Sequence, residues 1–305
     1  MVTGGYNQTM IDAALEPTLA DEEPSPEVEL PPHPWDLRTI TFLLGVHGCL
    51  LLAPFYFSWS GLFLAIVLYT LTACGITLGY HRLLTHQSYK APKWLAYIIV
   101  TCAALSAQAG PAVWVAIHRH HHANSDSEQD PHDASRGFWW SHLGWMLKLT
   151  PRRLDDSFTE VRARDVLADP YYRFLDKNFF YLSMLLLAGL YQVGGWSWLL
   201  WAGVVRIAAV FHATWLVNSA SHRYGYRTYE TDDLSTNCWW VALLTFGEGW
   251  HNNHHAFPRS ARHGLRWWEV DLSWGVLLFL ERFGLVEKLQ TPSERQRERF
   301  ENGRR

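Results

Sequence analysis

Two long stretches with almost no charge most constrain how this chain can fold. Residues 39–80 hold no Asp, Glu, Lys or Arg, and residues 178–221 hold only Arg206. A helix that crosses a bilayer needs about 20 apolar residues, so each stretch has room for two. Pro54 in the first stretch and Gly194–Gly195 in the second mark the turns. We therefore predict an all-α membrane protein with four transmembrane helices in two hairpins. The predicted spans are roughly 38–57, 61–80, 178–193 and 197–217.

The positive charges predict how these spans are oriented. Neither hairpin turn carries Lys or Arg, whereas the Lys and Arg residues other than Arg206 flank or follow the spans on the opposite side. Cytoplasmic loops of membrane proteins carry an excess of Lys and Arg. We therefore expect a multi-pass membrane protein with both termini in the cytosol, and a cytosolic helical cap built from residues 81–177 and 222–290. The 17 Trp suit a membrane interface, and the net charge of -3 gives no support for nucleic-acid binding.

The two ends of the chain differ in composition from the rest. Residues 1–36 contain eight acidic residues and six prolines but no Lys or Arg, so we expect a disordered acidic tail. Residues 291–305 form a basic C-terminal end, which leaves 37–290 as the main domain. The four Cys form no C-x-x-C pair, so we expect buried thiols rather than disulfides.

Nine of the 16 His lie in four groups, two of them next to the predicted spans and all of them in the predicted cytosolic cap. Residues spaced i, i+3 and i+4 share a helix face, so the two HxxHH groups can each direct three imidazoles to one place. Neutral imidazole binds iron, copper, zinc and nickel. One such group is often a solvated patch, but four groups at corresponding membrane edges suit two metal ions. The groups are His81 and His86; His118, His121 and His122; His222, which follows Asn218; and His251, His254 and His255.

The uncharged segment 94–117 separates the first two histidine groups. If it crossed the membrane, those groups would lie on opposite sides and could not share a metal site. We therefore expect it to lie in the interface or to re-enter, with a break at Gly110–Pro111. The short apolar segments 235–250 and 272–286 are expected to be interfacial or packed helices.

The order HxxxxH, HxxHH, NSxxH, HxxHH resembles the membrane-bound fatty-acyl desaturases. The resemblance is strongest to their delta-9 (stearoyl) branch of the cyanobacterial acyl-lipid type, and it runs from about residue 36 to about 286. Further similar segments are residues 75–82, 130–132, 139–142 and 247–258.

The resemblance implies two iron ions (Fe²⁺) held by histidine. One iron would take His81, His86, His118, His122 and His254, and the other His121, His222, His251 and His255, with Asn218 reaching the second through a water. His120 occupies a variable position and is not expected to be a ligand. His47 and His212 are expected to pack within the spans, whereas His132, His142 and His263 remain open between roles beside the site and on the surface. A metal-bound imidazole usually donates its other N–H to a carboxylate or a carbonyl. The candidate carboxylates near the histidine groups are Asp126, Asp130, Asp133 and Glu248.

The resemblance also implies the reaction. An unactivated methylene has no acidic proton, so a redox cofactor must activate dioxygen to remove its hydrogens. We expect a cis double bond in a 16- or 18-carbon acyl chain, with dioxygen and two electrons consumed and two waters released. The substrate would be an acyl lipid or acyl-CoA in contact with membrane lipids. The electron donor would be ferredoxin, with cytochrome b5 as the alternative, and zinc is an expected substitute in recombinant material.

Two other functions remain open at this stage. A lipid hydroxylase or carotenoid ketolase would use the same histidine scaffold but would produce an alcohol or a ketone. A membrane metal transporter or sensor would need ionisable ligands near the middle of the bilayer, where only Arg206 lies.

The second span also suggests where a substrate tunnel ends. At about 1.5 Å per residue, Ala73 lies roughly 12 Å from His81 and Tyr69 roughly 18 Å. The two residues are four apart, so they share a helix face. If that face lines the tunnel, Ala73 leaves room for the methyl end of an 18-carbon chain and Tyr69 closes it; ordinary helix packing is the alternative.

Overall fold

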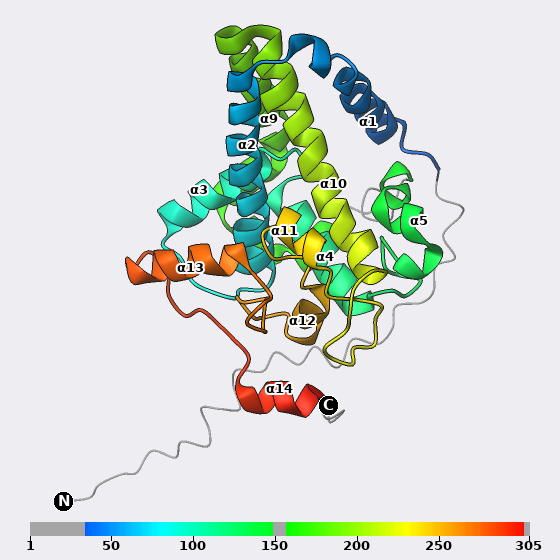
Figure 1. Cartoon of the computed structure of the whole chain (residues 1–305), viewed down its shortest axis with the longest axis vertical. Helices are drawn as coiled ribbons and strands as arrows, with labels where there is room; N and C mark the ends of the chain where they lie inside the picture. The colour runs from blue at the N-terminus through cyan, green and yellow to red at the C-terminus, as the bar shows by residue number, and fades with distance from the viewer. Residues whose placement is uncertain (1–33, 149–156, 302–305) are drawn as a thin grey trace, which may run out of the picture. The chain divides into compact units, whose positions relative to one another are not determined.

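A computed structural model describes residues 34–148 and 157–301 (Figure 1). Within these ranges the chain forms helices and isolated β-bridges but no strand, which confirms the all-α prediction. Residues 1–33 of the predicted acidic tail and the last four residues of the basic end lie outside the described residues. The helices are α1 (Leu37–Leu50), η3 (Ala53–Tyr56), α2 (Trp59–Cys74), η4 (Gly75–Thr85), α3 (Lys93–Ala104), α4 (Pro111–Asn124), η5 (Ala134–Arg136), α5 (Phe138–His142), η6 (Gly144–Leu147), α7 (Ser157–Arg162), α8 (Arg164–Ala168), α9 (Pro170–Trp198), η7 (Leu199–Val205), α10 (Arg206–Ser219), η8 (Ala220–His222), α11 (Trp239–Leu244), α12 (His251–Ala256), α13 (Leu272–Arg282) and α14 (Glu294–Glu301).

The first predicted hairpin has one short arm and one long arm. Helix α1 ends at Leu50, short of the predicted residue 57, and a 3₁₀ turn that contains Pro54 follows it. Proline has no N–H to continue an α-helix. Helix α2 begins after Ser58, whose side chain accepts the N–H of Gly61. It continues as the π-helical η4 beyond the predicted end at residue 80, which carries it past His81.

The second hairpin is formed by α9 on one side and η7 with α10 on the other. The helical path turns at Gly195, whose φ of 59° and ψ of -151° are not helical. Glycine adopts such a conformation without steric cost. The two arms lie beside each other in Figure 1 and pack through residues such as Leu187 and Gly203. Helix α9 begins at Pro170, earlier than the predicted residue 178, because Asp169 caps it by accepting the N–H of Tyr171.

The segment between the first two histidine groups is two helices with a break between them. Helix α3 ends at Ala104, and α4 begins at Pro111, directly after the predicted break at Gly110. Asp176 of α9 caps α4 by accepting the N–H groups of Ala112 and Val113. The break lets α4 run in a new direction, so that its histidines meet those that follow α2.

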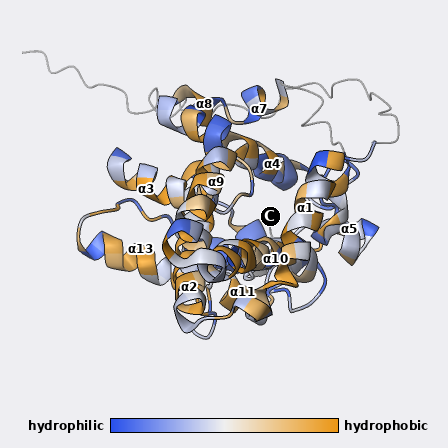
Figure 2. Cartoon of the chain, turned by 90° about the horizontal axis from the view of Figure 1, so that it is seen from above, coloured by the Kyte–Doolittle hydropathy of each residue, from blue (hydrophilic) through white to orange (hydrophobic). Residues whose placement is uncertain are grey.

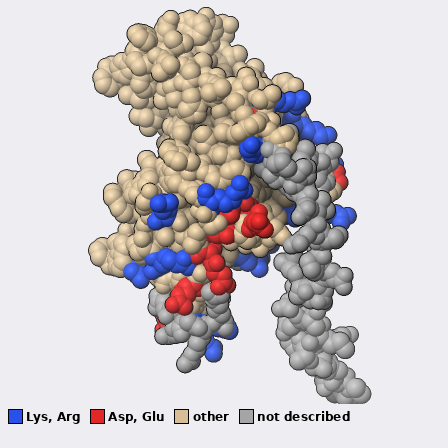
Figure 3. Space-filling model, turned by 90° about the vertical axis from the view of Figure 1, so that its right-hand side faces the viewer, with Lys and Arg blue, Asp and Glu red and all other residues tan. Residues whose placement is uncertain are grey.

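The surface of the described residues divides into an uncharged part and a charged part. The top of the molecule shows no Lys, Arg, Asp or Glu in Figure 3, and those that are visible lie on its right-hand margin and across its middle and lower parts. Hydrophobic residues run along α2, α9 and α10 in Figure 2, and hydrophilic ones gather on α4. Residues 59–85 and 170–222 form helical stretches long and apolar enough, by length and composition, to cross a membrane. This division suits a protein associated with a bilayer.

Candidate metal centre

The nine clustered histidines come together at the charged end of the helices. His81 and His86 lie at the end of η4, His118, His121 and His122 on α4, and His222 at the end of η8. Helix α12 brings His251, His254 and His255 from the other side. The predicted convergence of four sequence groups is therefore what the fold produces.

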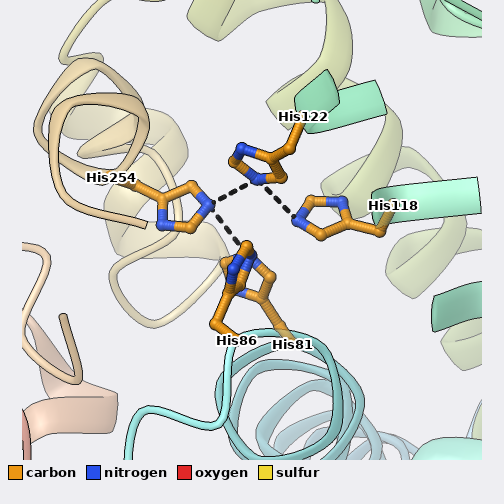
Figure 4. Close-up of side chains that lie close together, drawn as sticks. All are labelled: His81, His86, His118, His122 and His254. Atoms are coloured by element: carbon orange, nitrogen blue, oxygen red, sulfur yellow. Dashed lines mark hydrogen bonds between the residues drawn. The ribbon is translucent and has the colours of Figure 1, made fainter. Parts of the chain in front are cut away.

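Five of these imidazoles form one group. One ring nitrogen from each residue lies within 4.8 Å of the corresponding nitrogens of the other four. The residues are His81, His86, His118, His122 and His254. Figure 4 shows the five rings pointing toward a common centre from η4, α4 and α12. The Nε2 atoms of His254 and His122 are 2.9 Å apart, and those of His81 and His254 are 3.1 Å apart.

Four imidazoles form a second group. Here too, one ring nitrogen from each residue lies within 4.8 Å of those of the other three. The residues are His121, His222, His251 and His255. The Nε2 atoms of His255 and His251 are 3.1 Å apart, and those of His255 and His121 are 3.4 Å apart. The structure thus divides each HxxHH triplet between two sites. In each triplet the i and i+4 pair turns to one group and the remaining histidine to the other, unlike the single meeting point that spacing alone suggested.

Buried carboxylates hold the outer nitrogen of four of these imidazoles. The Nδ1 atoms lie 2.7–2.8 Å from a carboxylate oxygen in each case. A carboxylate on Nδ1 fixes the proton there and leaves the Nε2 lone pair free to bind a metal. The pairs are His81 with Glu248, His121 with Asp130, His222 with Asp126, and His255 with Asp233.

Glu248 contacts three side chains, the clustered His81 and two further residues, His263 and Arg82. Its Oε2 atom lies 3.2 Å from Nδ1 of His263, and its Oε1 accepts from the buried Arg82 at 3.3 Å. Burial alone raises the pKa of Glu248, but the charges of His81, His263 and Arg82 outweigh it and lower the pKa well below its usual value. Glu248 therefore stays ionised beside His81.

The inward nitrogens fit metal ions rather than hydrogen bonds. An imidazole whose Nδ1–H faces a carboxylate presents only a lone pair at Nε2, yet His121 and His255 turn two such atoms toward each other. Facing lone pairs repel unless a cation lies between them. Among the described residues, Nε2 of His86 and of His222 are buried without a hydrogen-bond partner. Burial, followed by the neighbouring imidazoles, lowers the pKa of His122 well below its usual value, and neutral imidazole is the form that binds metal.

The remaining histidines lie outside both groups. His120 contacts the carbonyl of Gln129 through Nε2. His47, His212 and His142 form a chain of ring contacts that ends at Ser219. His132 and His263 lie beside the site instead, each near a carboxylate that also holds a clustered histidine, Asp130 and Glu248 respectively.

The candidate carboxylates divide in the same way. Asp126, Asp130 and Glu248 contact clustered histidines, whereas Asp133 accepts the N–H of Ser135 in a turn. Sequence reasoning missed Asp233, because it lies 22 residues from its partner His255 and no spacing links them.

An apolar cavity opens onto both histidine groups. Its walls come from α2 with η4, from α4, from α10 and from the end of α11. His81, His118, His251 and Asn218 lie at its polar end, and Ala73 is part of its apolar wall. Tyr69 is not among the lining residues; its hydroxyl donates to the carbonyl of Leu244 at 2.7 Å.

The fold and the site define a class of protein: a helical, membrane-associated protein with a histidine-rich metal centre beneath an apolar cavity. Residues 57–277 match the family model described as fatty acid desaturase. The chain belongs to the fatty acid desaturase family, and its metal centre is therefore one that uses iron.

Curated relatives of this family are similar over most of the chain. An sn-1 stearoyl-lipid 9-desaturase of Anabaena variabilis is 51% identical, covering 84% of this chain and 94% of its own. The sn-1 stearoyl-lipid 9-desaturase of Synechocystis sp. is 48% identical, covering 84% and 80%. A chloroplastic palmitoyl-monogalactosyldiacylglycerol delta-7 desaturase of Arabidopsis thaliana is 45% identical, covering 87% and 71%.

Proposed function

We propose that the chain is a delta-9 acyl-lipid desaturase that inserts a cis double bond into saturated 16- or 18-carbon chains. The observation that carries this proposal is the apolar cavity that ends at two convergent histidine groups. The names of the two cyanobacterial relatives, stearoyl-lipid 9-desaturases, support the substrate class and the position of the double bond.

The proposed ligands follow the two groups. His81, His86, His118, His122 and His254 would hold one iron, and His121, His222, His251 and His255 the other. Asn218 lines the cavity beside His251, a place that suits contact with the second iron through a water. Bound iron supplies the dioxygen-dependent redox chemistry that removes hydrogens from an unactivated methylene.

The protein's own residues supply position and protection. The cavity walls hold an extended acyl chain and exclude water between Ala73 and the histidines. Glu248, Asp126, Asp130 and Asp233 keep the Nδ1 protons of their imidazoles in place, so that the ring planes are set before metal arrives. Ala73, which lines the cavity, is proposed to leave room for the methyl end of the chain, and Tyr69, one helical turn further on, to close the cavity.

The membrane arrangement is part of the proposal. Four spans, α1 with η3, α2, α9, and η7 with α10, would place the histidine groups and both termini in the cytosol, as the distribution of Lys and Arg favours. Electrons would come from ferredoxin, with cytochrome b5 as the alternative, because the sequence resembles the cyanobacterial acyl-lipid desaturases.

Expression in a host that lacks its own desaturase tests this function. We expect new 9-unsaturated 16- and 18-carbon chains in the glycerolipids, and their loss in the His118→Ala variant. Double bonds are located by mass spectrometry, one lipid class at a time. An alcohol or a ketone in place of the alkene would favour the hydroxylase or ketolase alternative, and iron binding without any oxygen consumption would favour a transporter or sensor.

A further inference from the structure

We infer that the acyl chain enters the cavity sideways from the bilayer, through the gap between α2 and α10 that α11 closes, while its carrier stays among the membrane lipids. This inference rests on the proposed desaturase function and names its route of substrate entry. Seen from above in Figure 2, α11 lies at the rim of the molecule with α2 and α10.

Leu244 connects the cavity with the outer surface. It is one of the residues that line the cavity, yet 43% of its surface is exposed. The α2–η4 helix and α10 also line the cavity, through residues that include Ala73 and Ala213. Leu244 is therefore a large side chain of α11 that belongs both to the cavity wall and to the outer surface.

The outer side of α11 suits lipid rather than water. Trp239 is 67% exposed and Leu243 is 60% exposed, whereas Val241 is fully buried against α10. Helix α11 has six residues, and its large outward side chains are apolar. Contact of these side chains with lipid acyl chains is more favourable than their exposure to water. Trp239 is a residue that favours the membrane interface.

One hydrogen bond joins the end of α11 to α2. The hydroxyl of Tyr69 donates to the carbonyl of Leu244 at 2.7 Å, so these two residues meet at the wall of the cavity. The inner side of α11 is held by backbone hydrogen bonds and by close packing of Ala242 against Gly249. Entry of an acyl chain therefore needs the exposed side chain of Leu244 to turn aside, while the backbone of α11 stays in place.

A side entrance fits a glycerolipid for a physical reason. One acyl chain can leave the bilayer and enter an apolar cavity without contact with water, while the headgroup and second chain remain in the membrane. A chain carried by a water-soluble group would instead come from the cytosolic end, past the histidines. The position of Leu244 therefore favours a carrier that is itself a membrane lipid.

Two matched variants test this route, Leu244→Trp and Leu243→Trp. Both replace an exposed leucine of α11 by Trp, but only Leu244 lines the cavity. The full chain is reconstituted with iron, and supplied with dioxygen and reduced ferredoxin, in phosphatidylcholine vesicles that contain a glycerolipid with a diazirine-bearing stearoyl chain. Photo-crosslinking to residues 69–77 and 210–217 measures entry without turnover, and desaturation of stearoyl-lipid measures turnover.

We expect Leu244→Trp to lower both crosslinking and the desaturation rate by about 10-fold or more, because the larger indole overpacks this wall of the cavity and blocks it. Iron content should be unchanged, and Leu243→Trp should behave as the wild type. Wild-type rates and crosslinks in Leu244→Trp, or equal losses in both variants, would overturn the side entrance. A third outcome separates entry from reaction. If the wild type forms crosslinks that Leu244→Trp loses, but the wild type makes no alkene, the entrance is supported and the proposed reaction is refuted.

Discussion

The Oδ2 atom of Asp126 lies 2.8 Å from Nδ1 of His222, which ties the loop after α4 to the end of the α10–η8 helix. The same carboxylate accepts the N–H groups of Leu234 and Ala134. Burial alone raises the pKa of Asp126, but the hydrogen bond from His222 outweighs it and the net shift is downward. One ionised carboxylate therefore joins three separate parts of the chain around one imidazole.

This contact predicts a specific loss in the Asp126→Ala variant. Partners of metal-bound histidines typically contribute about 10–100-fold to metal affinity or activity. A chelator should therefore remove iron from Asp126→Ala at a concentration about 10–100-fold lower than it needs for the wild type. Asp133→Ala is the matched control, because the Asp133 carboxylate accepts the N–H of Ser135 in a turn and lies in none of the four carboxylate–imidazole pairs of the two histidine groups. Equal iron retention in the two variants would contradict the role given to Asp126.

The proposed ligands predict which histidines are essential. His118→Ala, His222→Ala and His254→Ala should abolish activity while the protein still inserts in membranes, because each removes one donor from a group. His120→Ala should keep most activity, since His120 lies outside both groups. Full activity in His222→Ala would show that this imidazole is not a ligand.

The two histidine groups predict the metal content. Anaerobic reconstitution with Fe²⁺ should give two irons per chain, measured by elemental analysis against protein concentration. Recombinant protein that has not been reconstituted should contain zinc in the same sites, because imidazole also binds zinc. A limit of one iron per chain would mean that only one group is a metal site.

The place of Ala73 in the cavity wall predicts a change in chain length. Ala73→Leu adds bulk about 12 Å from His81 and should shift the product ratio from 18 toward 16 carbons. Tyr69→Ala should admit longer chains, because it removes the ring one turn further on. The ratio is measured by gas chromatography of the lipid chains at equal iron content, and an unchanged ratio in both variants would remove these residues from the end of the cavity.

The proposed topology predicts the accessibility of single cysteines. Cysteines that replace Lys90 and His120 should react with an impermeant reagent from the cytosolic side, although 94–117 lies between them. Cysteines that replace Ser60 and Trp196 should react only from the opposite side. Labelling of positions 90 and 120 from different sides would mean that the segment between them crosses the membrane.

Local sequence determined much of this protein. Long uncharged stretches predict the two hairpins, and turn residues such as Gly195 predict where the chain reverses. Both signals can be read from the sequence because they involve residues close together in the chain. The break at Gly110 and the crowding of histidines at span ends could be predicted for the same reason. The helix ends were predicted less closely: α1 ends at Leu50 and α9 begins at Pro170, although the signals that mark these ends, Pro54 and Asp169, are local as well.

The family resemblance implied how the imidazoles are divided between two sites, but helix spacing alone did not, and only the tertiary structure decided which carboxylates support them. Spacing placed His118, His121 and His122 on one helix face, but the fold turns His121 toward a different group from the other two. Asp233 reaches His255, and Tyr69 reaches Leu244, across gaps in sequence that no periodicity bridges. Such contacts depend on how whole helices pack against one another. The helical repeat determines which residues share a face, but it does not determine which element that face contacts. The local sequence therefore does not predict these contacts.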